Sequence, residues 1–176
     1  MESRFLVQER THYLCAMKIL MVCLGNICRS PLAEGILQHK AVHAGLDWTV
    51  ESAGTNGFHT GEAPHHLSQK VAKQNGIDIS AQVSRQFVAD DLEKYDLIYA
   101  MATDVMDDIR RIAGNRMNES KVKYFRHELE SGVNDVPDPW YGDEDGYTEV
   151  YDLIDRTSDM IVQRYSAINK STPADV

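Results

Sequence analysis

Cysteine is scarce in this chain of 176 residues, and all three cysteines lie within its first thirty positions. This placement excludes the disulfide framework of a small secreted domain, and the interval between Cys23 and Cys28 does not match a zinc knuckle. A histidine pair at helical spacing, His39 and His43, has no evident third metal ligand. We therefore expect a protein of a reducing compartment, the cytoplasm, that holds no metal.

Long hydrophobic runs and an excess of positive charge are also missing. The longest apolar stretch, residues 14–24, contains Lys18 and is too short to cross a bilayer. Acidic residues precede it and no small-residue cleavage site follows, which argues against a signal peptide. The net charge of −9 argues against non-specific nucleic-acid binding but leaves room for a local cationic pocket, since it describes the whole surface. We expect neither a membrane nor a nucleic-acid partner.

The residues that are present suit one globular domain. Hydrophobic residues make up 43% of the chain and charged residues 26%, which excludes wholesale disorder. Residues 1–16 differ from the rest in having mixed charge and no period, so we interpret them as an N-terminal extension. The domain itself is predicted over residues 17–168, followed by a C-terminal tail at 169–176.

Short apolar runs alternate with helical patterns along the predicted domain. We predict strands at residues 19–22, which form a short apolar run, at 48–54, which alternate and end in glycine, and at 96–101 and 121–125. Between and after them we predict helices that start at Ser30 as N-cap, at Pro64 and at Thr103 as N-cap, a loop at 131–146 and a last helix at 147–167. This alternation predicts an α/β fold in three layers, a parallel sheet with helices on both faces. Ligands of such sheets bind at the carboxyl ends of the strands, so the turn after the first strand is the candidate site.

That turn contains the residue types that an anion site needs. A loop that enters a helix presents unpaired backbone N–H groups, and the helix dipole adds positive potential. Gly25 and Asn26 tolerate the left-handed backbone angles that turn N–H groups inward, and Arg29 offers a planar fork to two phosphate oxygens. In this field Cys23 should be a thiolate nucleophile, and the Ser30 hydroxyl can donate a hydrogen bond to its sulfur.

The run from Val22 to Glu34, VCLGNICRSPLAE, resembles the signature of the low-molecular-weight protein tyrosine phosphatases, and the resemblance extends through residues 51–55, 75–77 and 137–142. It implies a flavodoxin-like sheet of four parallel strands and hydrolysis of phosphotyrosine through a phosphocysteine, with no metal or other cofactor. The implied substrates are phosphotyrosine-containing proteins or small aryl phosphates, and we expect a monomer or a weak dimer. The positions implied to bind phosphate are Leu24, Gly25, Asn26, Ile27, Cys28, Arg29 and Ser30.

A phenolate that leaves phosphorus needs a proton, which a carboxylic acid on a loop can supply. The residues alone leave several candidates on the loop at 131–146, and the resemblance selects Asp138, which lies between two prolines. Trp140 and Tyr141 follow it and match an aromatic pair that sandwiches the phenyl ring, while Phe58 and Leu24 match other wall positions. Their place beside glycines in loops favours exposure over burial in the core.

The resemblance also implies residues that support the loop or protect the sulfur. The support positions are Asn26, Ser30, Ser52 and Asn75. Asn75 stands where many relatives have a histidine, and Ala102 stands where an acidic residue is common, so both depart from the pattern. Cys28 matches a redox partner that traps oxidised Cys23 as a disulfide, although a small space-filling residue is an equal alternative.

Three alternatives to a tyrosine phosphatase stay open at this point. An arsenate reductase on this fold needs further cysteines as a relay, and the chain has none after Cys28. In the arginine phosphatases that use this scaffold, a threonine replaces Ile27 and the acid loop is less aromatic, so Ile27, Trp140 and Tyr141 favour an aryl ester. An inactive anion-binding module is the third alternative, and the joint presence of nucleophile, cation and acid argues against it.

Overall fold

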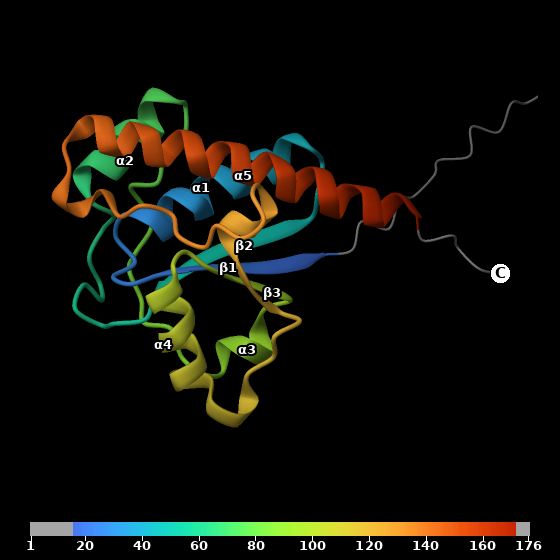
Figure 1. The fold of residues 1–176 in the computed structure, drawn as a ribbon. Coiled ribbons are helices and arrows are strands. Elements are labelled where there is room, and N and C mark those ends of the chain that lie inside the picture. The colour runs from blue at the N-terminus through green and yellow to red at the C-terminus, as the bar shows by residue number, and fades with distance from the viewer. Residues whose placement is uncertain (1–15, 172–176) are drawn as a thin grey trace, which may run out of the picture.

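The centre of the molecule is a four-stranded parallel sheet, seen in a computed structural model that describes residues 16–171 (Figure 1). The strands are β1 (Met17–Cys23), β2 (Trp48–Gly54), β3 (Leu97–Ala100) and β4 (Val122–Tyr124), in the order β2-β1-β3-β4. All three pairings are parallel, which confirms the predicted sheet. Of the predicted N-terminal extension only residue 16 is described. Residues 169–171 of the predicted C-terminal tail continue the last helix, and residues 172–176 lie outside the described residues.

Helices cover both faces of this sheet, as predicted for a three-layer α/β fold. Figure 1 shows α1 (Arg29–His43), α2 (His66–Gln74) and α5 (Glu144–Ser171) on one face. The other face carries α3 (Asp91–Lys94) and α4 (Thr103–Ala113). Short 3₁₀ turns lie at Gly114–Arg116, Phe125–Glu128 and Pro139–Tyr141. Within the described part of the chain, no helix is both long and apolar enough to span a membrane.

The alternation of side chains along β1 builds two separate cores. Ile19, Met21 and Cys23 point to one face, where they join the cluster formed with α1 and α5. Leu20 and Val22 point to the other and join the cluster beneath α4. Both faces of β1 are therefore buried, which is why its sequence is a continuous apolar run. The chain leaves β1 at Cys23, at the carboxyl edge of the sheet.

Four predicted helix starts need correction. α2 begins at His66, with His65 as its N-cap, two residues after the predicted start at Pro64. α1 begins at Arg29 and its N-cap is Cys28, not the predicted Ser30. Ser30 lies inside the first turn, so its hydroxyl does not cap the helix and can bond elsewhere. α4 follows Ala102, and Thr103 is its first residue; its backbone N–H and hydroxyl both donate to Asp135, 2.8 Å away. α5 begins at Glu144, within the predicted loop, because acidic residues stabilise the positive end of a helix.

Candidate active site

The loop between β1 and α1 forms a cup around the sulfur of Cys23. Of the two residues expected to adopt left-handed angles, Asn26 does so with a φ of 56°, whereas Gly25 does not. This angle turns the backbone N–H of Asn26 back toward Cys23, where it donates to the sulfur at 3.3 Å. The Ser30 hydroxyl lies 3.0 Å from the same sulfur. Cys23 therefore faces polar groups both from the loop and from the first turn of α1.

The side chain of Asn26 ties this loop to its surroundings. Its amide nitrogen donates to Ser30 Oγ at 2.9 Å and to Ser52 Oγ at 2.8 Å, and its oxygen accepts from the backbone N–H of Arg85 at 2.9 Å. These bonds agree with the supporting positions predicted for Asn26, Ser30 and Ser52. The fourth predicted position is wrong: the amide of Asn75 donates to the Val71 carbonyl at the end of α2. The segment around Arg85 takes that place instead.

Arg29 and Asp138 meet over the loop although 109 positions separate them. One guanidinium nitrogen of Arg29 is 2.7 Å from Asp138 Oδ2, and another donates to the Val136 carbonyl at 3.2 Å. Asp138 also accepts from the backbone N–H of Trp140 at 3.1 Å. Arg29 is buried, whereas 40% of the Asp138 side chain is exposed. The predicted cation and the predicted acid therefore share one side of the site.

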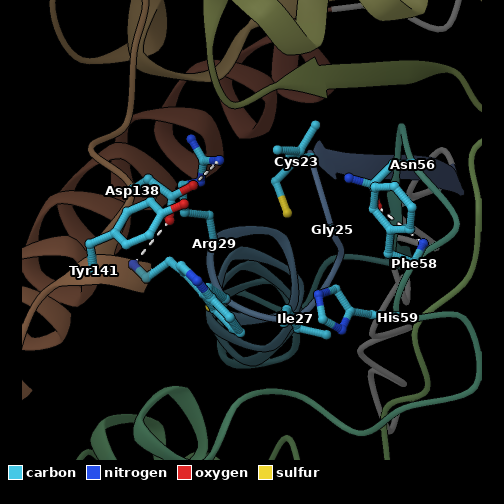
Figure 2. A pocket seen from close by; sticks show the side chains of 12 residues that line it. Cys23, Gly25, Ile27, Arg29, Asn56, Phe58, His59, Asp138 and Tyr141 are labelled. Carbon is cyan, nitrogen blue, oxygen red and sulfur yellow. Dashed lines mark hydrogen bonds and ion pairs between the residues drawn. The ribbon is translucent and has the colours of Figure 1, made fainter.

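A cavity of about 300 Å³ opens over the sulfur. The residues that line it are Cys23, Leu24, Gly25, Ile27, Cys28, Arg29, Asn56, Phe58, His59, Asp138, Trp140 and Tyr141. Figure 2 shows the sulfur of Cys23 in the middle, with Asp138 and Tyr141 on one side and Asn56 and Phe58 on the other. Phe58 is 86% exposed and Tyr141 95%, which confirms the prediction that these aromatics lie outside the core. Together they form a slot with the carboxyl of Asp138 at one wall and the sulfur of Cys23 at its floor.

Histidines that the sequence analysis did not assign flank Trp140. The ring of His59 lies 5.8 Å from the indole ring, and that of His65 lies 5.4 Å from it. His65 also stacks on Tyr147 and donates its backbone N–H to the Ile27 carbonyl at 2.8 Å. Burial, with a smaller effect from neighbouring His66, lowers the pKa of His65 and favours its neutral form. A neutral ring can pack against Tyr147 without an unpaired charge.

The second thiol of the loop lies under the cavity floor. Cys28 Sγ is 3.4 Å from the hydroxyl of Tyr147 on α5. Burial raises the pKa of the Cys28 thiol to about 11, although the hydrogen bond with Tyr147 lowers it. Cys28 is therefore protonated near neutral pH.

A carboxylate behind the loop also escaped the sequence analysis. Glu34, on the second turn of α1, accepts a hydrogen bond from Ser52 Oγ at 2.6 Å. Burial and the nearby charge of Glu51 raise the pKa of Glu34 to about 7, against the lowering effect of the Ser52 hydrogen bond and of Arg85. The proximity of Glu34 to Ser52 depends on how α1 packs on β2, so no local pattern reveals it.

Comparison with known proteins agrees with this geometry. The sequence profile of the family "Low molecular weight phosphotyrosine protein phosphatase" matches residues 18–172. The chain is 38% identical over 141 residues to the low molecular weight protein-tyrosine-phosphatase YfkJ of Bacillus subtilis, covering 78% of this chain and 88% of YfkJ. It is 35% identical over 152 residues to the low molecular weight phosphotyrosine protein phosphatase of Schizosaccharomyces pombe, covering 82% and 95%.

Solved structures resemble the fold equally well. The crystal structure of YfkJ superposes with a TM-score of 0.79 at 34% identity, over 87% of this chain and 96% of that one. The YwlE arginine phosphatase superposes with a TM-score of 0.78 at 26% identity, over 85% and 96%. The two scores are nearly equal, so the fold does not distinguish a tyrosine from an arginine phosphatase.

Proposed function

The chain belongs to the low molecular weight phosphotyrosine protein phosphatase family, and from this premise we propose which of its residues carry the hydrolysis of phosphotyrosine. The reaction of this family passes through a phosphocysteine intermediate. We assign the nucleophile to Cys23, the phosphate-binding cation to Arg29 and the proton donor to Asp138. One observation supports the assignment above all: the Cys23 sulfur lies at the floor of a cavity whose wall carries the paired Arg29 and Asp138.

In the first step the Cys23 thiolate attacks phosphorus, and the bond from phosphorus to the phenolic oxygen breaks. The loop N–H groups of residues 24–30 and the Arg29 guanidinium hold the equatorial oxygens, where negative charge accumulates. Binding of the phosphate to Arg29 displaces Asp138 from its ion pair. The freed carboxylate takes up a proton from solvent and transfers it to the departing oxygen, which leaves as a neutral phenol.

The second step returns the enzyme to its starting state. Asp138, now a carboxylate, accepts a proton from water as the water oxygen attacks the phosphorus of phosphocysteine. The bond between sulfur and phosphorus breaks, inorganic phosphate leaves, and Cys23 is again a thiolate. The Ser30 hydroxyl, 3.0 Å from the sulfur, stabilises the thiolate as a leaving group in this step.

The walls of the cavity favour an aryl ester over phosphoarginine. Phe58, Trp140 and Tyr141 offer flat apolar surfaces on both sides of the opening, which suit a phenyl ring. We propose phosphotyrosine-containing proteins and small aryl phosphates as substrates. We also propose that the enzyme acts as a monomer or a weak dimer. A cytoplasmic location fits the need for a reduced thiol.

Turnover of an aryl phosphate by two variants tests the assignment. Cys23→Ser should lower turnover to background, because a serine hydroxyl is not ionised at neutral pH. Asp138→Ala should lower kcat by about 10²- to 10⁴-fold while inorganic phosphate still inhibits competitively. Normal turnover by Cys23→Ser would remove the mechanism. If the unaltered enzyme hydrolysed phosphoarginine faster than it hydrolysed phosphotyrosine, the result would instead favour the alternative of an arginine phosphatase.

We also propose that Cys28 protects Cys23 from irreversible oxidation. Peroxide oxidises the Cys23 thiolate to a sulfenic acid, the Cys28 sulfur attacks it, and a disulfide forms as water leaves. The nearby Tyr147 hydroxyl can donate to Cys28 as its proton departs. Full recovery of activity by dithiothreitol after peroxide treatment supports this role. Loss that dithiothreitol cannot reverse supports the space-filling alternative.

A further inference from the structure

His59 lies in the wall of the cavity, and the proposed reaction gives it no role. Figure 2 shows it on the same side as Asn56 and Phe58, across the cavity from Asp138. Its side chain is 29% exposed, and Nδ1 of the ring lies 2.9 Å from the Glu62 carboxylate. Because an ionised carboxylate only accepts hydrogen bonds, Nδ1 carries a proton and donates to Glu62. No residue in the described part of the chain bonds Nε2, so this nitrogen is available to a ligand.

The turn that carries His59 is fixed to the segment after α2. The backbone N–H of Glu62 donates to the His59 carbonyl at 2.9 Å, which closes the turn. The backbone N–H of Gly61 donates to the Ser84 carbonyl at 2.9 Å, and that of Ser84 donates to the Glu62 carbonyl at 2.8 Å. The Ser84 hydroxyl donates to the Gly25 carbonyl at 3.3 Å. The turn therefore has a fixed place beside the loop between β1 and α1, the phosphate loop.

Gly25 leaves room for the His59 ring against the phosphate loop. Left-handed backbone angles were the predicted reason for a glycine here, but Gly25 does not adopt them. The ring gives another reason, because a Cβ atom on residue 25 would lie 3.1 Å from Cδ2 of His59 and 3.9 Å from Nε2. Carbon atoms in contact are normally about 3.5 to 4 Å apart. The ring also lies 5.8 Å from the indole ring of Trp140, so His59 connects the phosphate loop with the aromatic wall.

We propose that His59 is a specificity-determining residue, whose Nε2 forms a hydrogen bond with the main chain of a polypeptide substrate beside the phosphotyrosine. The proposal rests on the proposed function and selects phosphotyrosine-containing proteins over small aryl phosphates as the preferred substrates. A neutral ring accepts at Nε2, and a ring with a second proton donates there. A peptide main chain offers partners for both forms, an N–H and a C=O, whereas a small aryl phosphate offers only its phosphate.

The phosphate is the other group that Nε2 could bind, but it has partners already. In the proposed reaction the loop N–H groups and the guanidinium of Arg29 hold its equatorial oxygens. His59 directly follows Phe58, which is 86% exposed at the opening of the cavity. A polar group fixed in this part of the wall suits the portion of a substrate that leaves the cavity. In a protein substrate this portion is the main chain of the phosphotyrosine and its neighbours.

Two substrates with the same phenolic leaving group separate a main-chain contact from a phosphate contact. The pentapeptide Ala-Ala-phosphotyrosine-Ala-Ala, blocked at both ends, offers a main chain without large flanking side chains. The second substrate, 4-methylphenyl phosphate, offers the same ring and phosphate without a main chain. We expect the unaltered enzyme to have a kcat/KM about 5- to 10-fold higher for the peptide, as one added hydrogen bond would give.

Three variants assign this preference to Nε2. His59→Phe keeps a flat ring between the phosphate loop and Trp140 but removes Nε2, so the preference for the peptide should disappear. His59→Gln has an amide that donates and accepts at about the reach of Nε2, so it should keep at least about half of the preference. His43→Phe is the matched control, because His43 is an exposed residue on the last turn of α1 and does not line the cavity. It should leave both values of kcat/KM within about 2-fold.

Equal values of kcat/KM for the two substrates in the unaltered enzyme overturn the proposal. An equal loss for both substrates in His59→Phe also overturns it, and would assign Nε2 to the phosphate. Thermal unfolding shows whether His59→Phe folds, and the first comparison decides the matter if it does not.

Binding separates this proposal from the proposed function. Dissociation constants of the peptide and of 4-methylphenyl phosphate are measured with Cys23→Ser, alone and combined with His59→Phe, and these measurements need no turnover. Tighter binding of the peptide that is lost with His59→Phe supports the role of His59 even if the unaltered enzyme hydrolyses neither substrate. That absence of hydrolysis would contradict the proposed function alone.

Discussion

At the scale of single residues, the phosphate loop and β2 approach each other too closely for a side chain at Gly54. A Cβ atom there would lie 2.8 Å from the Leu24 carbonyl oxygen and 2.9 Å from the Asn26 nitrogen. Both atoms belong to the backbone of the cup, which cannot yield by a rotamer change. We predict that Gly54→Ala lowers the free energy of unfolding by about 2 kcal/mol and weakens inhibition by inorganic phosphate about 10-fold. Urea unfolding and competitive inhibition measure the two effects.

Gly146→Ala is the matched control for this substitution. Gly146 lies in the first turn of α5, and no atom lies within 4 Å of a Cβ built there. Alanine should therefore be neutral or stabilising by up to about 1 kcal/mol, with phosphate inhibition unchanged. If Gly54→Ala and Gly146→Ala changed stability and phosphate inhibition equally, the close approach of β2 to the phosphate loop at Gly54 would not be the cause of the effect.

Residues of the site differ in how far the sequence could predict them. Cys23, Asn26, Arg29 and Ser30 lie on one turn, so their meeting follows from local backbone geometry. The meeting of Asp138 with Arg29 followed only from a resemblance, because no local pattern joins residues 109 positions apart. Contacts that depend on helix packing were not predicted. The residues missed in this way are Glu34, Arg85 and Tyr147.

At the scale of elements, the segment that carries Asp138, the proposed proton donor, is anchored to the start of α4 and to the residue after β3. Asp135 accepts from the backbone N–H and hydroxyl of Thr103 at the start of α4. The next residue, Val136, donates its N–H to the Met101 carbonyl at 2.8 Å and accepts from Arg29. These bonds fix the backbone just before Asp138, so the segment is less free than a surface loop of its length.

We predict that Asp135→Ala costs about 1 kcal/mol of stability, as loss of a helix cap usually does. It should also lower kcat about 10-fold with little change in KM, because the acid is less well placed when the leaving group departs. Steady-state kinetics with an aryl phosphate measure the split. Asp145→Ala, on the exposed start of α5, should keep kcat within about 2-fold. A similar loss of kcat in Asp135→Ala and Asp145→Ala would mean that the removal of a negative charge, and not the loss of the bonds to Thr103, lowers the rate.

The strands were predicted more accurately than the helix starts. β1 and β3 contain continuous apolar runs because both of their faces are buried, whereas β2 is visible from its alternation of buried and exposed side chains. The helix α3 has four residues, too few for a period, and was missed. The first turn of α5 was assigned to a loop because Glu144, Asp145 and Gly146 have no apolar side chain. Their helical form depends on the dipole and on the turns that follow.

At the scale of the whole molecule, titration of groups near the site is linked to global stability. The lowered pKa values of Glu51, Asp108 and Glu144 stabilise the fold above the ordinary carboxylate range and lose this effect only in acid. His65 has a lowered pKa, so the fold loses stability as pH falls through the ordinary histidine range. Glu34 acts in the opposite sense, because its pKa is raised.

The folded protein therefore binds a proton at Glu34 more tightly than the unfolded chain does. From the ordinary value of 4.5 up to about 7, the folded state holds more protons at this site, so its contribution to stability falls as pH rises and then stays constant. We predict that Glu34→Gln, which cannot ionise, gains about 2 kcal/mol relative to the unaltered protein between about pH 5 and about pH 8. Urea unfolding of both proteins at matched pH measures this difference, and the contribution of His65 cancels because both proteins contain it. A difference that is independent of pH would mean that Glu34 is ionised throughout this range and that its pKa is not raised in the folded protein.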